Sequence, residues 1–255
     1  MGAGHTHALY VHEHSLVHRL APEVKIAAAF AFVFAAALTP RHAVWAFAID
    51  AVALATVITV ARLPVRFVLA RMLVVVPFVA FAVTIPFIGS GERVDVLGVA
   101  VSQPGLWATW NIVAKATLGV AVSVTLAATT EIAALLRGLE RLRVPAPLTQ
   151  IASFMVRYLE LIAGDLTRMR RAMSARGHDP RWLWQLRPLA ACVGSLFIRA
   201  YERGERVYAA MRSRGYTGAM PVGDVGLAPA RQWLLAANLP LIAGVAAGVA
   251  LVMGP

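Results

Sequence analysis

Five apolar runs dominate this chain of 255 residues and restrict the folds open to it. The runs cover about residues 24–38, 43–60, 67–88, 106–130 and 233–253. A helix needs roughly 20 apolar residues to cross the ~30 Å hydrocarbon core of a bilayer. The first run is short for such a crossing, and residues 39–42 join it to the second run as a tight helical hairpin. The sequence therefore predicts an all-α, polytopic membrane protein with about five transmembrane helices.

The composition agrees with this class, because 59% of the residues are hydrophobic and only 15% are charged. The single cysteine, Cys192, leaves no partner for an intrachain disulfide or for a Cys-x-x-Cys redox site. The first 23 residues carry five histidines and no apolar run, so we expect no cleavable signal peptide.

Basic residues set the expected orientation in the membrane. The chain has 24 Lys and Arg against 13 Asp and Glu, and residues 131–231 hold 16 Arg and 8 of the acidic residues. Positively charged loops stay cytoplasmic, so we expect the N-terminus, the loop near Arg62 and residues 131–231 inside, and the C-terminus outside. This reading makes nucleic acid an unexpected partner. Because 22 of the basic residues are Arg, forked contacts to carboxylates or phosphates are favoured.

Residues 131–231 carry apolar side chains at three- and four-residue spacing, which is typical of amphipathic helices. Pro145 and Pro147 separate a first helix from a second, residues 177–180 end the second, and Pro188 opens a third. We expect these helices to lie against the membrane domain and to present their other face to an acidic partner. The predicted division is a His-rich N-terminal segment, a four-helix transmembrane region, a coupling-helix region and a C-terminal transmembrane helix, at residues 1–23, 24–130, 131–231 and 232–255.

A short phrase occurs twice in the coupling-helix region. Residues 172–177 read Ala-Met-Ser-Ala-Arg-Gly, and residues 210–215 read Ala-Met-Arg-Ser-Arg-Gly, 38 residues later. Each copy predicts a helix end, with good helix formers followed by Arg in the last turn and a Gly cap. One such end alone is ordinary capping. Its duplication in register makes Arg176 and Arg214 the candidate functional residues.

These features resemble a known family. The doubled Arg-Gly phrase, the Val144-Pro145 break followed by Arg157-Tyr158, and residues 15–25 look like the transmembrane T component of energy-coupling factor (ECF) transporters. Within that group the resemblance is strongest to the CbiQ subunits of cobalt importers, and it covers nearly the whole chain.

The resemblance implies a T subunit that joins two cytoplasmic ABC ATPases to a separate substrate-binding membrane subunit, the S component, in a bacterial or archaeal cell membrane. It also implies a cobalt-type S component. The chain contains no G-x-x-x-x-G-K-[ST] phosphate loop, so we expect a non-catalytic subunit without a cofactor, with ATP and Mg used by the partner ATPases. Carried over by motif, the ATPase-coupling residues are Ala175, Arg176, Gly177, Ser213, Arg214 and Gly215. The second copy departs from the first in having Ser213 where the first has Ala175.

Histidines and intramembrane charges form two further signals. Imidazole suits cobalt and nickel, so the N-terminal histidines are candidate metal ligands, and the alternative is a solvated, mobile tail. Asp50, Arg71 and Lys115 fall within the apolar runs, where ionisable groups are costly and normally paired. Asp50 belongs to a cation path, forms a structural pair with Lys115 or Arg71, or reaches the membrane interface. The candidate metal ligands are His5, His7, His12 and His14.

Two other classes of protein remain open. A classical ABC permease subunit would form its own substrate path, and Glu131-Ile132-Ala133-Ala134 with Gly138 loosely matches the coupling loop of such importers. A membrane enzyme would use the Arg cluster to bind an anionic headgroup. It would need an acid/base set, whereas His178-Asp179 is a single adjacent pair whose side chains would not face each other on a helix.

Overall fold

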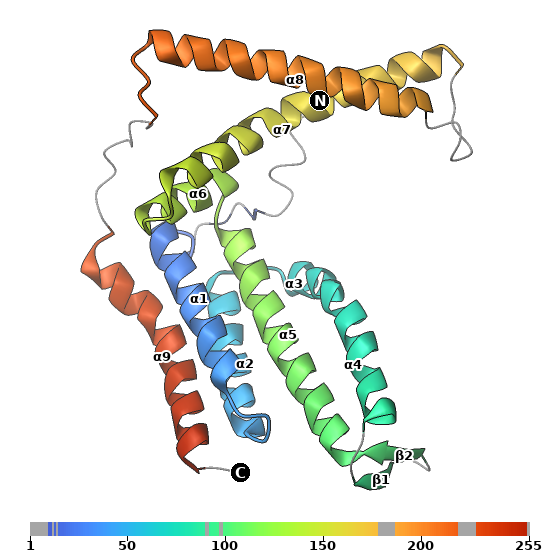
Figure 1. Cartoon of the computed structure of the whole chain (residues 1–255). Coiled ribbons are helices and arrows are strands. Elements are labelled where there is room, and N and C mark those ends of the chain that lie inside the picture. The colour runs from blue at the N-terminus through green and yellow to red at the C-terminus, as the bar shows by residue number, and fades with distance from the viewer. Residues whose placement is uncertain are drawn as a thin grey trace. The chain divides into compact units, whose positions relative to one another are not determined.

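The computed structural model describes residues 10–11, 13, 15–89, 92–96, 99–177, 187–218 and 228–253. The chain divides into two compact units (Figure 1). Of the described residues, those up to 142 and those from 228 onward form the membrane unit, and residues 143–177 and 187–218 form the hairpin unit.

The membrane unit is built from apolar helices. Three of its helical segments, Val65–Ile88, Gln103–Thr129 and Ala230–Met253, are long and apolar enough to cross a membrane. This confirms an all-α, polytopic membrane protein. Helices α1 and α2 have 17 residues each, which at 1.5 Å per residue makes them about 25 Å long. A crossing by all five helices therefore stays a prediction. The elements of the unit are α1 (Pro22–Leu38), α2 (Val44–Val60), α3 (Val65–Met72), η1 (Leu73–Val75), α4 (Val76–Ile88), β1 (Arg93–Val96), β2 (Val99–Ser102), α5 (Gln103–Thr129), α6 (Ile132–Arg141) and α9 (Ala230–Met253).

A small β-hairpin interrupts the helical fold between α4 and α5. Strands β1 and β2 are antiparallel, with Arg93 opposite Ser102 and Val96 opposite Val99. Valine alternates with other residues in both strands, and β-branched residues suit extended backbone.

Four helices form the core of the membrane unit. Side chains from α1, α2, α5 and α9 meet in one buried cluster that includes Phe32, Phe47, Leu118 and Ala243. A second cluster joins α2 to α9 through alanines alone, which lets the two backbones approach closely. Its members are Ala43, Ala46, Ala246 and Ala250.

The two lysines of the chain connect α1 and α5 reciprocally. Lys25 of α1 donates from Nζ to the carbonyl oxygen of Thr129 at 2.7 Å, and Lys115 of α5 donates to the carbonyl oxygen of Ala37 at 2.7 Å. Both carbonyls lie in the last turn of a helix, where backbone oxygens lack an intrahelical partner and carry the negative end of the helix dipole. Each helix therefore supplies the cap of the other, and the two helices run antiparallel.

The intramembrane charges are not paired with one another. Asp50 is fully buried, and neither of its carboxylate oxygens accepts a hydrogen bond from the described residues. Lys115 is bonded to a backbone carbonyl, and the Arg71 guanidinium lies 3.6 Å from the centroid of the Phe67 ring. Among the described residues, Asp50 therefore makes no contact pair with Lys115 or Arg71, which is one of the alternatives that the sequence leaves open.

Helix α6 packs tightly on the start of α1. A Cβ atom on Gly138 would lie 2.9 Å from the backbone nitrogen of Glu23 and 2.9 Å from Cδ1 of Ile26, so only glycine fits this contact. One turn further on, Nη1 of Arg141 lies 2.8 Å from Oε1 of Glu23. By packing, α6 belongs with the membrane helices. The four-part functional division drawn from the sequence, with a boundary at residue 131, stays a prediction.

The hairpin unit contains two long amphipathic helices, α7 (Ala146–Ala175) and α8 (Arg187–Ser213). Pro145 precedes α7 and Pro188 lies in the first turn of α8, as proline does where a helix begins. These helices confirm the second and third helices expected from the apolar spacing.

Candidate coupling site

Both copies of the repeated phrase form the end of a helix. Gly177 has φ +78° and Gly215 has φ +85°, the left-handed conformation that glycine adopts most readily. After α7, the Gly177 amide donates to the Ser174 carbonyl at 2.9 Å. After α8, the Gly215 amide donates to the Arg212 carbonyl at 3.0 Å. The predicted C-terminal caps are confirmed.

The cap of α8 is a complete Schellman motif. In addition to the Gly215 bond, the Tyr216 amide donates to the carbonyl oxygen of Met211 at 3.0 Å. The Tyr216 hydroxyl donates to Oε1 of Gln150 at 3.0 Å, which ties this cap to the start of α7. The backbone at Arg214 is therefore held by α8 on one side and by the hydrogen bonds of Gly215 and Tyr216 on the other.

Ser213, the residue that distinguishes the second copy of the phrase, is hydrogen-bonded within the chain and does not need a partner outside it. Its hydroxyl donates to the Ala210 carbonyl at 2.9 Å, within its own helix. Ser213 thus presents much the same outward surface as Ala175, its counterpart in the first copy.

Arg176 and Arg214 are both exposed. Among the residues that the structure describes, neither side chain takes part in an ion pair or a hydrogen bond. A guanidinium offers five N–H donors in a planar fork that matches a carboxylate. Both tips are consequently free to bind an acidic group outside the chain.

Three contacts show that α7 and α8 run antiparallel (Figure 1). Cys192 Sγ donates to Met173 Sδ at 3.1 Å, and Arg203 Nη2 lies 3.5 Å from Asp165 Oδ2. The third contact is the bond from Tyr216 to Gln150. Arg214 therefore lies beside the start of α7 and Arg176 at its other end, which at 1.5 Å per residue separates the two tips by roughly 40 Å.

Asp165 is the charged link at the middle of the hairpin. It pairs with Arg168 on its own helix and with Arg203 on α8. The hydrogen bond from Arg168 is the main cause that lowers the pKa of Asp165 below its ordinary value. Asp165 is therefore ionised at neutral pH and holds the two helices in register. The i, i+3 pair with Arg168 could be recognised in the sequence, whereas the contact with Arg203 could not.

The hairpin also carries unpartnered apolar surface. A groove of about 270 Å³ between α7 and α8 is lined by Phe154, Tyr158, Ile162, Ala200, Arg203, Gly204, Val207 and Met211. Other large apolar side chains are exposed on both helices, among them Met155, Leu159, Phe197 and Tyr201. A helix pair of this kind needs a membrane or a protein partner to cover it.

The proposed metal ligands His5, His7, His12 and His14 lie outside the described residues, so their role stays a prediction. His18 is described, and both of its ring nitrogens are occupied: Nδ1 accepts from Ser15 Oγ at 2.7 Å and Nε2 donates to the Val11 carbonyl at 3.1 Å in the tautomer that satisfies both. Burial lowers the pKa of His18. In the described part of the chain, no group of three His, Cys, Asp or Glu could hold a metal ion.

An apolar helical unit and a basic amphipathic hairpin in one chain are typical of a membrane protein that has a surface for a partner. Residues 13–222 match the family model of CbiQ, described as a cobalt transport protein, and the chain therefore belongs to the CbiQ family. It is a transmembrane component of the energy-coupling factor type.

Three relatives show the range of the similarity. The cobalt transport protein CbiQ of Rhodobacter capsulatus is 34% identical over 163 residues, which are 64% of this chain and 65% of the relative. This match spans slightly less than two thirds of that relative's length. The energy-coupling factor transporter transmembrane proteins EcfT of Thermotoga maritima and Bacillus selenitireducens are 22% and 26% identical, over 83% and 82% of this chain and 81% and 82% of the relatives.

Proposed function

We propose that this chain is the coupling subunit of an importer, linking two cytoplasmic ABC ATPases to a separate S component. The observation that carries the proposal is the hairpin itself. It presents two similar helix ends, each with an exposed arginine, at opposite ends of one antiparallel pair. Two like docking elements about 40 Å apart suit two like partners.

The proposed substrate is the cobalt ion, and it follows from the relatives rather than from a metal site. The R. capsulatus relative is named a cobalt transport protein. In this proposal the metal is bound by a cobalt-type S component, and ATP and Mg are used by the ATPases. The chain would itself bind no cofactor and carry out no catalysis.

The hairpin geometry suits the transmission of movement. Each arginine would form a forked, charge-assisted hydrogen bond with a carboxylate of one ATPase. The Asp165–Arg203 pair and the Gln150–Tyr216 bond hold the helices in one register, so a displacement at one tip is transferred along a rigid pair instead of being absorbed. The groove and the exposed apolar side chains would face the S component or the bilayer.

Co-purification tests the proposal directly. With an affinity tag on this chain, mild solubilisation of native membranes should recover two ABC ATPase subunits and a small substrate-binding membrane protein. A matched preparation of Cys192→Ser, which leaves the arginine tips intact, should recover the same set. Recovery of ATPases without any separate S component would favour the classical permease alternative, and recovery of no ATPase would exclude both.

The orientation is a second prediction, made from arginine density. In a Cys192→Ser background, Ser174→Cys on the exposed end of α7 should react with an impermeant maleimide only in inverted vesicles. Asp95→Cys in the β-hairpin should react only in intact cells. Reaction of Ser174→Cys in intact cells would reverse the topology and remove the hairpin from the reach of cytoplasmic ATPases.

A further inference from the structure

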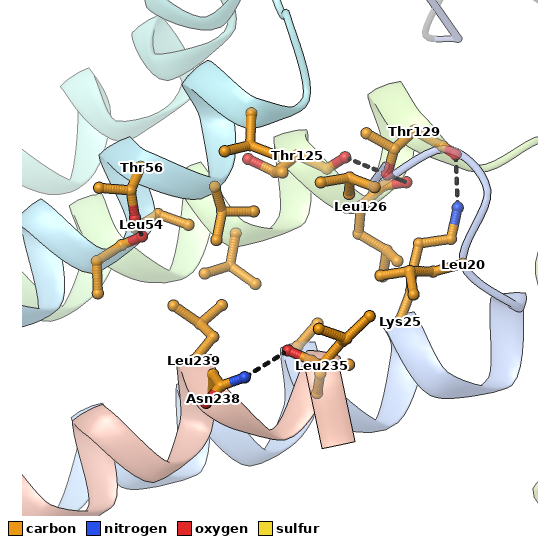
Figure 2. Close-up of a pocket in the computed structure, with 18 of the residues that line it drawn as sticks. Leu20, Lys25, Leu54, Thr56, Thr125, Leu126, Thr129, Leu235, Asn238 and Leu239 are labelled. Atoms are coloured by element: carbon orange, nitrogen blue, oxygen red, sulfur yellow. Dashed lines mark hydrogen bonds between the residues drawn. The ribbon is translucent and has the colours of Figure 1, made fainter. Parts of the chain in front are cut away.

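A cavity of about 360 Å³ lies within the membrane unit, among α1, α2, α5 and α9 (Figure 2). Its size is in the range of small-molecule sites. Most of its wall is apolar. The residues that line it include Leu20, Ala29, Ala53, Leu54, Val57, Val122, Leu126, Leu235, Leu239 and Ile242.

The cavity exists because α2 and α9 pack closely along only part of their length. The alanine cluster of Ala43, Ala46, Ala246 and Ala250 joins the C-terminal part of α9 to the start of α2. Toward the other ends of the two helices, residues 53–60 of α2 and residues 235–242 of α9 line the cavity. Leu235 lines it and is nevertheless 56% exposed. The cavity thus opens on the apolar surface of the unit, where acyl chains would lie.

One polar group in the wall has unused hydrogen-bonding capacity. The residue Lys25 is only 8% exposed, and within the described part of the chain its ammonium group, with three donors, makes one hydrogen bond, to the Thr129 carbonyl. Among the described residues Lys25 has no ion-pair partner, because the nearby Glu23 is paired with Arg141. Figure 2 shows the ammonium and Thr129 at one side of the cavity, across from Leu54 and Thr56. An unneutralised cation in an apolar site is costly and favours an anion.

The other polar groups of the wall do not need a ligand, because they already form hydrogen bonds within their own helices. Thr125 and Thr129 donate their hydroxyls to carbonyls one turn earlier in α5. Asn238 Nδ2 donates to carbonyls of its own helix, at Leu234 and Leu235. The ligand indicated by this wall is therefore mainly apolar, with one acidic group.

We propose that this cavity binds an anionic lipid, with part of an acyl chain against the apolar wall and an acidic headgroup oxygen accepting a hydrogen bond from Lys25. Lys25 lies at the end of α1 that the predicted topology places on the cytoplasmic side, where anionic lipids attract basic residues. The site does not depend on the proposed coupling function.

Native mass spectrometry of the delipidated, full-length protein tests the site. The probes are dioleoyl phosphatidylglycerol and dioleoyl phosphatidylcholine, which have the same acyl chains and differ in net charge. The wild-type protein should bind phosphatidylglycerol more tightly. Loss of a charge-assisted hydrogen bond in Lys25→Met should weaken phosphatidylglycerol binding about tenfold and leave phosphatidylcholine binding unchanged.

The chain offers a matched control for each part of the site. Lys115→Met also removes a lysine that caps a helix end at 2.7 Å, but Lys115 does not line the cavity, so lipid binding should be unchanged. Ala53→Phe fills the cavity and should abolish binding of both lipids. Ala51→Phe, on the exposed face of the same helix, should not.

Equal phosphatidylglycerol binding by the wild-type protein, Lys25→Met and Ala53→Phe would overturn the site. If Ala53→Phe loses lipid but Lys25→Met does not, the proposed headgroup contact is wrong. Retention of the wild-type elution volume and melting temperature by each variant shows that it is folded. A last outcome is that neither the wild-type protein nor Ala53→Phe binds lipid, and that the S component co-purifies only with the wild-type protein. This result would identify a protein segment as the occupant of the cavity and would also overturn the proposal.

Discussion

Replacing both Arg176 and Arg214 with alanine is expected to abolish cobalt uptake while the protein still inserts in the membrane. Each single variant should lose most of its uptake, because removal of one partner of a desolvated, hydrogen-bonded ion pair costs about 2–5 kcal/mol. The folded chain itself should be unaffected, since both side chains are exposed and the caps depend on backbone bonds. Uptake of radioactive cobalt and recovery of ATPases with the tagged chain are the measurements.

The matched control for this experiment is a double variant with the same change of charge elsewhere on the hairpin. Arg171→Ala with Arg206→Ala removes two exposed arginines from the same helices but from outside the tips. It should keep near-normal uptake. Lysine at both tips should give partial function, because a lysine cannot reproduce the planar fork. If the double alanine variant transports cobalt and retains its ATPases like the parent, the arginine tips are not the coupling contacts.

Arg141→Met should destabilise the membrane unit by about 3–5 kcal/mol, because it leaves a buried carboxylate without its cation. The side chains of Arg141 and Glu23 are only 18% and 5% exposed, and the second carboxylate oxygen of Glu23 has no partner among the described residues. The melting temperature of the purified protein in detergent is the measurement.

A paired variant separates the loss of the ion pair from the loss of packing. Glu23→Met together with Arg141→Met should recover much of the lost stability, since replacing a buried pair by apolar groups of similar size is often nearly neutral. Arg137→Met, a change of the same kind at another arginine of α6, serves as the control. An Arg141→Met protein as stable as the parent would show that this pair does not hold α6 to α1.

The local features of the candidate site could be predicted from the sequence, because short-range rules determine them. The Arg-Gly phrase specifies a helix end through glycine's left-handed conformation and the unpaired carbonyls of the last turn. The apolar spacing of α7 and α8 likewise specifies amphipathic helices. The placement of the two tips at opposite ends of a hairpin depends on contacts such as Cys192 with Met173, which join residues of different helices and have no sequence signature.

The intramembrane charges could likewise be recognised in the sequence, whereas their contacts could not. The sequence indicates that Asp50, Arg71 and Lys115 are costly inside a bilayer, and a charge partner is the natural expectation. In the structure, Lys115 contacts a backbone carbonyl, and the contacts of Arg71 include an aromatic ring. Which side chain will bind a carbonyl at a helix end cannot be predicted until the helices are placed beside each other. The cavity at Lys25 escaped prediction for the same reason.

The reciprocal capping of α1 and α5 also governs how the protein can be labelled. The chain has two lysines, and the ammonium of each is hydrogen-bonded to the neighbouring helix inside the membrane unit. Its surface cations are arginines, which do not react with the usual amine-directed esters. Lys25 is only 8% exposed, so reaction of such a reagent at this lysine would mark separation of these two helices. The protein thus contains its own chemical reporter for the opening of its membrane core.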